Sequence, residues 1–222
     1  MGFDLFITKL FSENPSDRFF FFCVVITVVV SIVLHELAHG WMAIRLGDDT
    51  PIRMERMTGN PLVHMGPFSL IALAMVGIAW GQMPIDPSRL KGKYGGSKVA
   101  LAGPAMNLIL AVVTLLAYAL WLRFGGFADP GTVAGNGQAF LRIAGITNLL
   151  LMCFNLLPIP PLDGSHVASD FFDGYRRFVA DPANRGAVMI AFLFAFAMSQ
   201  PLAMACSRVA FEAIAFVVRV GT

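Results

Sequence analysis

The chain has 222 residues, of which 57% are hydrophobic and only 14% are charged, and its formal net charge is +2. Soluble globular domains carry about 25% charged residues, so this composition indicates a protein surrounded largely by lipid. A net charge this small, without any block of Lys or Arg, excludes nucleic acid as an expected partner. The cysteines Cys23, Cys153 and Cys206 lie far apart in apolar segments. They predict small buried side chains, not a disulfide framework or a thiolate zinc site.

Long apolar runs predict an all-α membrane protein, a polytopic bundle of five or six transmembrane helices, because helices satisfy their own backbone groups in lipid. Residues 1–18 are interpreted as a short interfacial turn or helix. The first membrane helix is expected at 19–46, which exceeds the roughly 20 residues that cross a bilayer. Further apolar segments follow at 67–80, 99–124, 139–157 and 187–220. We expect one membrane domain over residues 1–222, with its core at 19–170.

Two of these segments leave alternatives open. Segment 67–80 is short for a full crossing, so it either crosses at a tilt or dips into the membrane and returns. The last apolar region is broken at Gln200-Pro201, which predicts a helical hairpin over 187–220 or a kinked helix. Irregular or short extended loops are expected at 47–66 and 81–98.

The loop 81–98 is the most basic in the chain and should face the cytoplasm by the positive-inside rule. Its charged residues are Arg89, Lys91, Lys93 and Lys98 against Asp86. Loop 47–66 lies on the same side if segment 67–80 returns without crossing, and on the opposite side if it crosses.

The first helix carries the pattern His35-Glu36-Leu37-Ala38-His39 directly after the apolar run 19–34. Residues four apart lie on one face of a helix, so both imidazoles can reach one metal ion, with Glu36 beside them. A charged group at membrane depth costs at least about 2.5 kcal/mol on insertion scales and is usually functional. The pattern therefore predicts a zinc site, about a third of the way into the membrane from the end of this helix.

A catalytic zinc needs a third protein ligand. Asp163 is the best candidate, because it follows an apolar segment that ends in the helix-breaking sequence "PIPPLDG". The alternative is an ordinary turn aspartate at the membrane interface, and spacing alone does not separate the two.

"HELAH" followed by "NLLPIPPLDG" resembles the site-2 protease family of intramembrane zinc metalloproteases. That family carries H-E-x-x-H and N-x-x-P-x-x-x-D-G, the latter often with an extra proline. Asn155, Pro158, Asp163 and Gly164 match the second motif with one such additional residue between Pro158 and Asp163. "LAGPAMN" at 101–107 resembles a further family feature, Gly-Pro-x-x-Asn. The resemblance covers about residues 25–170 and suggests a compact core member without an inserted PDZ or CBS domain.

The resemblance implies one Zn²⁺ per chain, held by His35, His39 and Asp163, with Glu36 as general base. It also implies that Asn155 holds the substrate or its polarised carbonyl, although a hydrogen bond between helices is the alternative. Three further residues are candidates for substrate contact or support of the metal ligands: His64, Asn107 and His166.

The expected function is intramembrane endopeptidase activity on transmembrane segments of membrane-protein substrates, in regulated intramembrane proteolysis. The expected partners are such a substrate and the lipid bilayer; the sequence does not indicate an oligomeric state. The expected location is a bacterial-type cytoplasmic membrane, with the active site toward the cytoplasm. The alternatives are a catalytically silent scaffold or metal carrier with the same fold, and a zinc peptidase whose site lies outside the bilayer.

Overall fold

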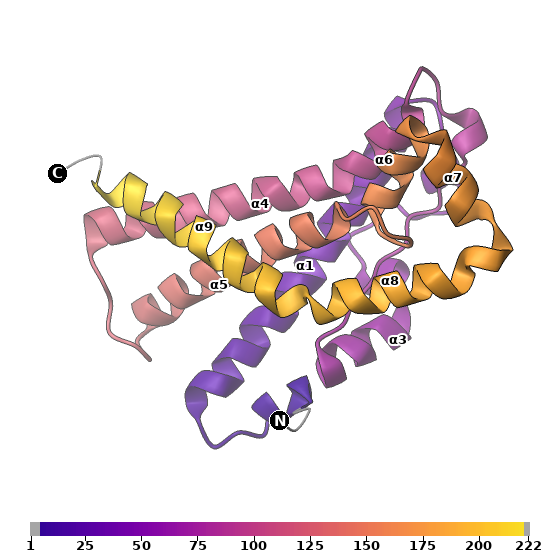
Figure 1. Cartoon of the computed structure of the whole chain (residues 1–222). Helices are drawn as coiled ribbons and strands as arrows, with labels where there is room; N and C mark the ends of the chain where they lie inside the picture. Colours follow the sequence, from indigo (N-terminus) through magenta and orange to yellow (C-terminus); the bar gives the residue numbers. More distant parts are fainter. Residues whose placement is uncertain (1–4, 220–222) are drawn as a thin grey trace.

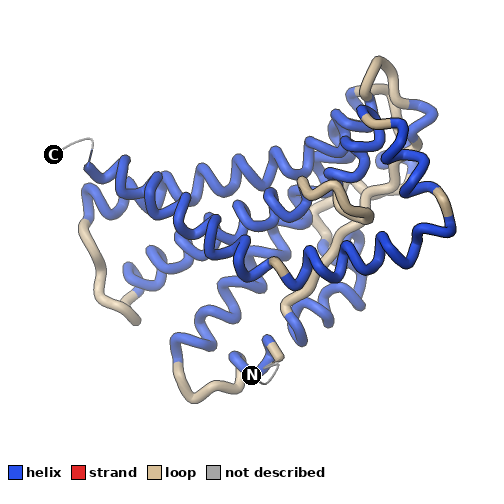
Figure 2. Tube along the Cα trace, viewed as in Figure 1, coloured by secondary structure: helices blue, strands red, loops and turns tan. Residues whose placement is uncertain are grey.

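The computed structural model describes residues 5–219, and helices dominate that range, which contains no strand (Figures 1 and 2). This confirms the all-α membrane class. The α-helices are α1 (Pro15–Arg45), α2 (Thr50–Arg53), α3 (Pro61–Val76), α4 (Gly95–Gly125), α5 (Val133–Asn155), α6 (Asp163–Phe171), α7 (Asp173–Ala180), α8 (Arg185–Ala197) and α9 (Ser199–Arg219). Short 3₁₀ turns occur at Phe6–Lys9, Pro87–Arg89 and Pro182–Asn184. The interfacial element expected at 1–18 corresponds in part to the first of these turns, and residues 1–4 lie outside the described range.

Helix α1 begins four residues before the expected position because Asn14 caps it. The Asn14 side chain accepts a hydrogen bond from the Ser16 N–H at 3.0 Å, and Pro15 occupies the first helical position, where no N–H is needed. The helix ends at Arg45, just before Gly47 adopts a left-handed φ of 102°. At about 1.5 Å per residue, its 31 residues extend roughly 46 Å, more than a bilayer core requires.

Helix α4 lies at the centre of the bundle and packs against α1, α5, α6 and α9 (Figure 1). Its buried positions are mostly small, which lets neighbouring helices approach closely, as in other membrane bundles. These small buried residues are Gly95, Ser97, Ala100, Gly103, Ala111 and Ala119. The helix that carries most of the packing therefore also brings its backbone close to its neighbours.

Helix α3 is followed by a non-helical segment, 78–86, that runs back beside it. The helix ends at Gly77, in a left-handed conformation with φ 77°. On the return, the Trp80 N–H donates to Ser69 Oγ at 2.9 Å, and the Gln82 N–H donates to the His64 carbonyl at 3.0 Å. Of the two arrangements open for segment 67–80, the structure therefore has the one that returns without crossing.

The loop that follows α1 and the loop that precedes α4 meet at the C-terminal end of α1. The Asp86 N–H donates to the Asp48 carboxylate at 2.8 Å, and the Lys91 N–H donates to the Leu46 carbonyl at 2.8 Å. The expected irregular loops are partly helical: α2 and the first turn of α3 lie within 47–66, and the turn Pro87–Arg89 and the start of α4 lie within 81–98.

In the C-terminal third, α8 and α9 are separated by the single residue Met198, and the Leu202 N–H still donates to the Met198 carbonyl across this break. In Figure 1, α9 runs on from α8 and packs on α4 and α5. Of the hairpin and the kinked helix that the sequence left open, the kinked helix describes this arrangement.

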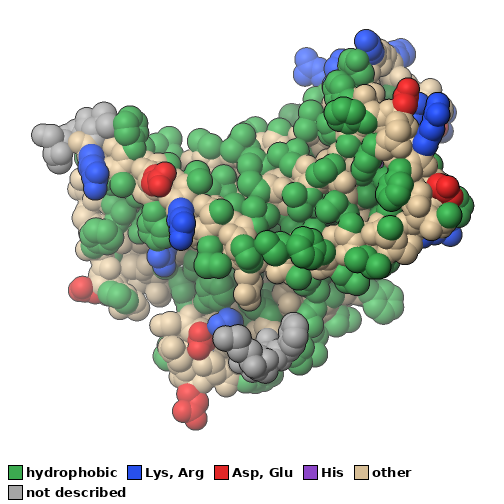
Figure 3. Space-filling model, in the orientation of Figure 1, with side chains coloured by type: hydrophobic (Ala, Val, Ile, Leu, Met, Phe, Trp, Pro, Cys, Tyr) green, Lys and Arg blue, Asp and Glu red, His purple; other side chains and the backbone are tan. Residues whose placement is uncertain are grey.

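Four described helices, α1, α4, α5 and α9, are long and apolar enough to cross a membrane. A fifth span exists if α7 and the segment Pro182–Ala197 count together, although they meet at a bend of 77°. The surface shown in Figure 3 fits a membrane-spanning bundle, since hydrophobic side chains cover its middle and charged side chains gather toward its ends.

The Asp48 carboxylate should hold the two loops together. Its side chain is fully buried and accepts hydrogen bonds from the backbone N–H groups of Thr50 and Asp86. Asp48→Ala leaves both donors unpaired and should lower the free energy of unfolding by about 1–3 kcal/mol. Asp49→Ala is the control: this exposed neighbour pairs with Arg53 and Arg89, and its loss should cost less than about 1 kcal/mol. Equal losses, measured by thermal unfolding in detergent, would contradict this role.

The same carboxylate predicts a dependence of stability on pH. Burial alone would raise the pKa of Asp48, but hydrogen bonds from Thr50 and Asp86 and the charge of Arg89 outweigh burial and lower it. The contribution of Asp48 is therefore complete above the unfolded pKa of about 3.9 and is lost as the pH falls through the lower folded value. The stability difference between the parent and Asp48→Ala should shrink when the pH falls below about 4. A constant or growing difference would show that the charge is not involved.

Candidate metal centre

Three side chains from α1 and α6 converge in the interior of the bundle. His35 and His39 lie one turn apart on the buried face of α1, and their Nε2 atoms are 2.9 Å apart. Asp163, the first residue of α6, places Oδ2 3.1 Å from His35 Nε2 and Oδ1 3.3 Å from His39 Nε2. These three residues form a group that could hold a metal ion, and it is the ligand set that the motifs suggested.

Asp163 reaches this position because the chain turns sharply after α5. The prolines of "PIPP" end helical structure, and α6 then begins at Asp163. Gly164 allows the first turn of α6 to press against the preceding loop: a Cβ atom there would lie 2.2 Å from the Leu156 carbonyl oxygen. At the other end of α6, the Asp170 carboxylate accepts hydrogen bonds from the N–H and the hydroxyl of Ser97, at 2.8 and 2.7 Å. The helix that carries Asp163 is thus fastened to α4.

The tautomer of His39 follows from its second ring nitrogen. His39 Nδ1 lies 2.7 Å from the Val99 carbonyl oxygen, which can only accept, so Nδ1 carries a proton and donates it. In a neutral imidazole this leaves a lone pair on Nε2, the atom that faces Asp163 and His35.

The tautomer of His35 follows from a longer chain of hydrogen bonds. His35 Nδ1 lies 2.6 Å from Asn107 Oδ1, and Asn107 Nδ2 donates to Asn148 Oδ1 at 3.0 Å. The chain ends where Asn148 Nδ2 donates to the Ala144 carbonyl at 2.9 Å. Since that carbonyl can only accept, each amide has one favourable orientation, and the Nε2 atom of neutral His35 also carries a lone pair.

Two imidazole lone pairs and a carboxylate therefore point at one another in the interior, where only a cation can relieve their repulsion. A proton bridges two of these atoms, whereas a metal ion contacts all three. Zinc bonds of about 2.0–2.1 Å in tetrahedral geometry place ligand atoms about 3.3 Å apart, close to the distances seen here. Asp163 Oδ2 is also buried without a hydrogen-bond partner. The donor set thus fits zinc, with His35, His39 and Asp163 as the residues that would hold it.

The face of α4 opposite the histidines fits the same interpretation. Val99, Gly103 and Asn107 lie four residues apart on one stripe of α4, and this stripe faces His39 and His35. A Cβ atom on Gly103 would lie 2.4 Å from His39 Nε2 and 2.5 Å from His35 Nε2. Only glycine leaves room for both imidazoles at this position.

Glu36 lies beside the group and is as buried as the two histidines, since each of the three residues is 7% exposed. The backbone of the non-helical segment 78–86 passes directly over it: a Cβ atom on Gly81 would lie 2.4 Å from Glu36 Oε1. Glu36 is thus close to the cluster without belonging to the set of metal-holding residues, as the pattern predicts for a residue that handles protons.

The other four residues that the sequence marked as candidates differ in their distance from the cluster and in their burial. Asn107 directly contacts His35. His64 is buried on α3, with Nε2 2.7 Å from the Thr58 carbonyl and Nδ1 without a partner. His166 is exposed on α6, and Asn155 Nδ2 donates to the Leu151 carbonyl of its own helix at 3.0 Å. The structure therefore brings Asn107 to the cluster but gives no contact there for His166 or Asn155.

Sequence reasoning missed Asn148, which is 2% exposed. The signal was available, because Asn148 is the one amide in the otherwise mostly apolar run "ITNLLLMCF" of α5. Polar side chains in such a run tend to face the bundle interior and form hydrogen bonds between helices.

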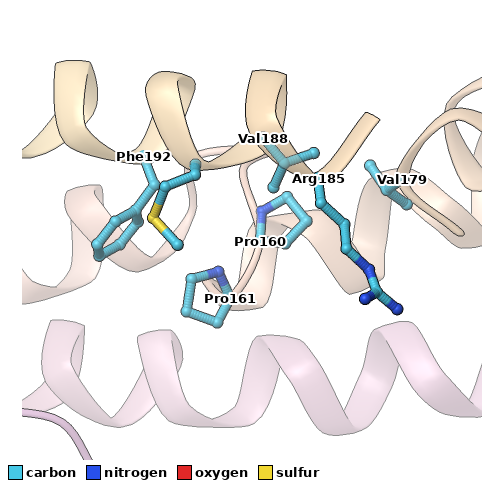
Figure 4. Close-up of a pocket in the computed structure, with 7 residues that line it drawn as sticks. Pro160, Pro161, Val179, Arg185, Val188 and Phe192 are labelled. Carbon is cyan, nitrogen blue, oxygen red and sulfur yellow. The ribbon is translucent and has the colours of Figure 1, made fainter. Parts of the chain in front are cut away.

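The cluster does not open into the neighbouring cavity. A cavity of about 400 Å³ lies between the Pro160-Pro161 turn and α8, with Val188 and Phe192 on its α8 wall and Arg185 at one end (Figure 4). Neither the histidines nor Asp163 line it. Glu36 is itself only 7% exposed, so a peptide must displace some part of the chain to reach it.

Known proteins with similar sequences are zinc peptidases by name. A family model described as "Peptidase family M50" matches residues 127–198. The Bacillus subtilis protein named "Putative zinc metalloprotease YwhC" is 36% identical over 188 residues, which cover 80% of this chain and 85% of that protein. "Putative zinc metalloprotease Rip2" of Mycolicibacterium smegmatis is 37% identical over 179 residues, covering 77% of this chain and 65% of that protein.

A more distant relative is "Zinc metalloprotease MJ0392" of Methanocaldococcus jannaschii, 26% identical over 200 residues. The match covers 88% of this chain but only 49% of that protein. No solved structure matches the chain.

Gly103 offers a steric test of the centre. Gly103→Ala places a methyl group against both Nε2 atoms, so it should weaken zinc binding at least tenfold, on the order of the losses known for residues around metal ligands. Gly186→Ala is the matched control, since that glycine is also helical but has open space around it. Zinc affinity is measured by competition with a chelator in detergent. Equal affinities of the two variants would contradict the close approach of α4 to the histidines.

Proposed function

The chain belongs to peptidase family M50, the site-2 protease family, whose named relatives are zinc metalloproteases, and on that premise we propose that it is an intramembrane zinc endopeptidase. Its substrates would be membrane proteins, cut within or near a transmembrane segment in regulated intramembrane proteolysis. One zinc ion per chain would be held by His35, His39 and Asp163.

One observation carries this proposal: two buried histidines converge with a partly buried aspartate, next to a buried glutamate, in a bundle whose helices are long and apolar enough to cross a membrane. Ionisable side chains in such a place are costly and are usually functional. Glu36 would have no evident use in a silent scaffold, and a metal carrier would need such groups along a path instead of at one point.

Zinc held by these residues would supply Lewis acidity, which would polarise a peptide carbonyl and lower the pKa of water so that it can lose a proton near neutral pH. Glu36 takes a proton from the attacking water, whose oxygen bonds to the carbonyl carbon of the substrate. As the carbon–nitrogen bond breaks, Glu36 passes this proton to the leaving amine. The side chains of His35, His39 and Asp163 take no proton in this scheme, and Asn155 is assigned to hold the substrate or its carbonyl oxygen.

The substrate must unwind locally, because the peptide bonds of a helix are shielded by their own hydrogen bonds. We assign the receiving element to the non-helical segment 78–86, whose Gly81 backbone lies against Glu36. An extended peptide can pair with such a segment through backbone hydrogen bonds. Displacement of this segment would also uncover Glu36.

The depth of the site supports cleavage inside the membrane. His35 is 20 residues after Pro15 and 10 before Arg45, the ends of α1. At about 1.5 Å per residue these intervals are roughly 30 Å and 15 Å, so the site lies about a third of the helix length from its C-terminal end. Loops 47–66 and 81–98 lie next to each other at the C-terminal end of α1, the end nearer to the site. The basic residues of 81–98 favour a position of this end on the cytoplasmic side of a bacterial-type membrane.

Two substitutions separate metal binding from proton transfer. Glu36→Gln should reduce peptide hydrolysis by about 10²–10⁴-fold while zinc remains bound, because an amide cannot accept the proton. Asp163→Ala should lose both, whereas Asp173→Ala, which removes a similar first-turn aspartate from α7, should lose neither. Zinc content and cleavage of a transmembrane peptide are measured together. Substantial turnover by Glu36→Gln would rule out its role as general base.

Sidedness is tested with single cysteines in intact cells. A cysteine at Ser88, in the basic loop, should react with a membrane-impermeant reagent only after the cells are opened. A cysteine at Asp129, exposed in the loop that follows the far end of α4, should react from outside. The reverse pattern would place the catalytic group toward the opposite face of the membrane.

A further inference from the structure

Asn148 lies two hydrogen bonds away from His35 and is among the most buried polar residues of the bundle. It is 2% exposed, and Asn107 is 1% exposed. The two amides connect α5 to α4, and Asn107 in turn contacts His35 on α1. A chain of hydrogen bonds therefore crosses three helices and ends on a candidate zinc ligand.

The direction of this chain is set at its far end. The Ala144 carbonyl can only accept, so Asn148 must turn its amide nitrogen toward it and its oxygen toward Asn107. Asn107 then donates to Asn148 and presents its own oxygen to His35 Nδ1. The order of donors and acceptors is thus imposed on His35 from a backbone carbonyl of α5.

We propose that Asn148 is a positioning residue for zinc binding: it fixes the amide orientation of Asn107 and thereby keeps the proton of His35 on Nδ1. This inference rests on the proposed role of His35 as a zinc ligand. Metal-binding histidines generally donate their second ring N–H to a partner that sets the tautomer. The structure assigns that role to an amide pair here, with Asn148 as the member that orients the other.

Without Asn148, the Asn107 amide can rotate by a half turn. Its NH₂ group would then face His35 Nδ1 and favour the tautomer with the proton on Nε2, the atom that must face the metal. A backbone carbonyl prevents the same exchange for His39, since it has no second orientation. The loss should therefore affect the metal site through His35 alone.

The test uses the full chain in detergent and measures zinc affinity by competition with a chelator. Asn148→Leu removes the acceptor with little change of volume and should raise the zinc dissociation constant about 10–100-fold. Asn148→Asp should stay within about threefold of the parent, because its carbonyl oxygen accepts from Asn107 and its protonated form donates to Ala144. Should Asn148→Leu not fold, Asn148→Ala carries the same expectation.

Gln138→Leu is the matched control. Gln138 is another buried amide on α5, but it binds the backbone of Gly126 and Ala128 at the far end of α4. It should lose stability without losing zinc affinity. A second readout follows the tautomer itself: ¹⁵N resonances of His35 in the metal-free protein should show the proton on Nδ1 in the parent and on Nε2 in Asn148→Leu.

Each outcome has one meaning. The proposal is overturned if Asn148→Leu or Asn148→Ala binds zinc as tightly as Gln138→Leu, if Asn148→Asp loses as much affinity as they do, or if the His35 tautomer does not change. His35→Ala separates this failure from that of the proposed function. If His35→Ala still binds zinc like the parent, the ligand assignment itself is wrong.

Discussion

The structure depends on one electrostatic constraint: the Nε2 atoms of His35 and His39 and the carboxylate of Asp163 are held close together in an apolar interior. Distances of 2.9, 3.1 and 3.3 Å among lone-pair donors are repulsive unless a cation lies between them. Burial strengthens this repulsion, because the surrounding helices offer little polar screening. The packing of the surrounding helices keeps these three side chains together.

Helix α4 does most of this work without contributing a ligand. Along one stripe, Val99 fixes the ring of His39, Gly103 leaves space for both imidazoles, and Asn107 fixes the ring of His35. Near its start, Ser97 binds Asp170 and so fastens the helix that carries Asp163. Helices α1 and α4 run antiparallel here, because His39 lies opposite Val99 and His35 lies opposite Asn107. A shift along either helix would break both contacts.

The sequence predicted the helical class and the pairing of His35 with His39 from local patterns, whereas Asp163 as the third ligand was implied by the family resemblance and stays a proposal. The spacing of His35 and His39 specifies a shared helix face, and Asp163 stands at a helix break that prolines announce. The return of segment 78–86 was only one of two possibilities, since it depends on the buried Asp48 and on contacts between distant loops. The position of Asn148 in an apolar helix marks it as an interior polar residue, but the sequence does not show that its partner is Asn107. Asn155 stays a prediction, as its amide bonds to its own helix.

X-ray absorption at the zinc edge of the purified, zinc-loaded protein tests the central claim most directly. The account predicts nitrogen and oxygen neighbours at about 2.0–2.1 Å, with outer-shell scattering from two imidazole rings that falls to one ring in His35→Ala. It also predicts no sulfur neighbour at about 2.3 Å, since the cysteines are not part of the site. A spectrum with sulfur ligands, or one without imidazole scattering, would contradict the assignment of His35, His39 and Asp163.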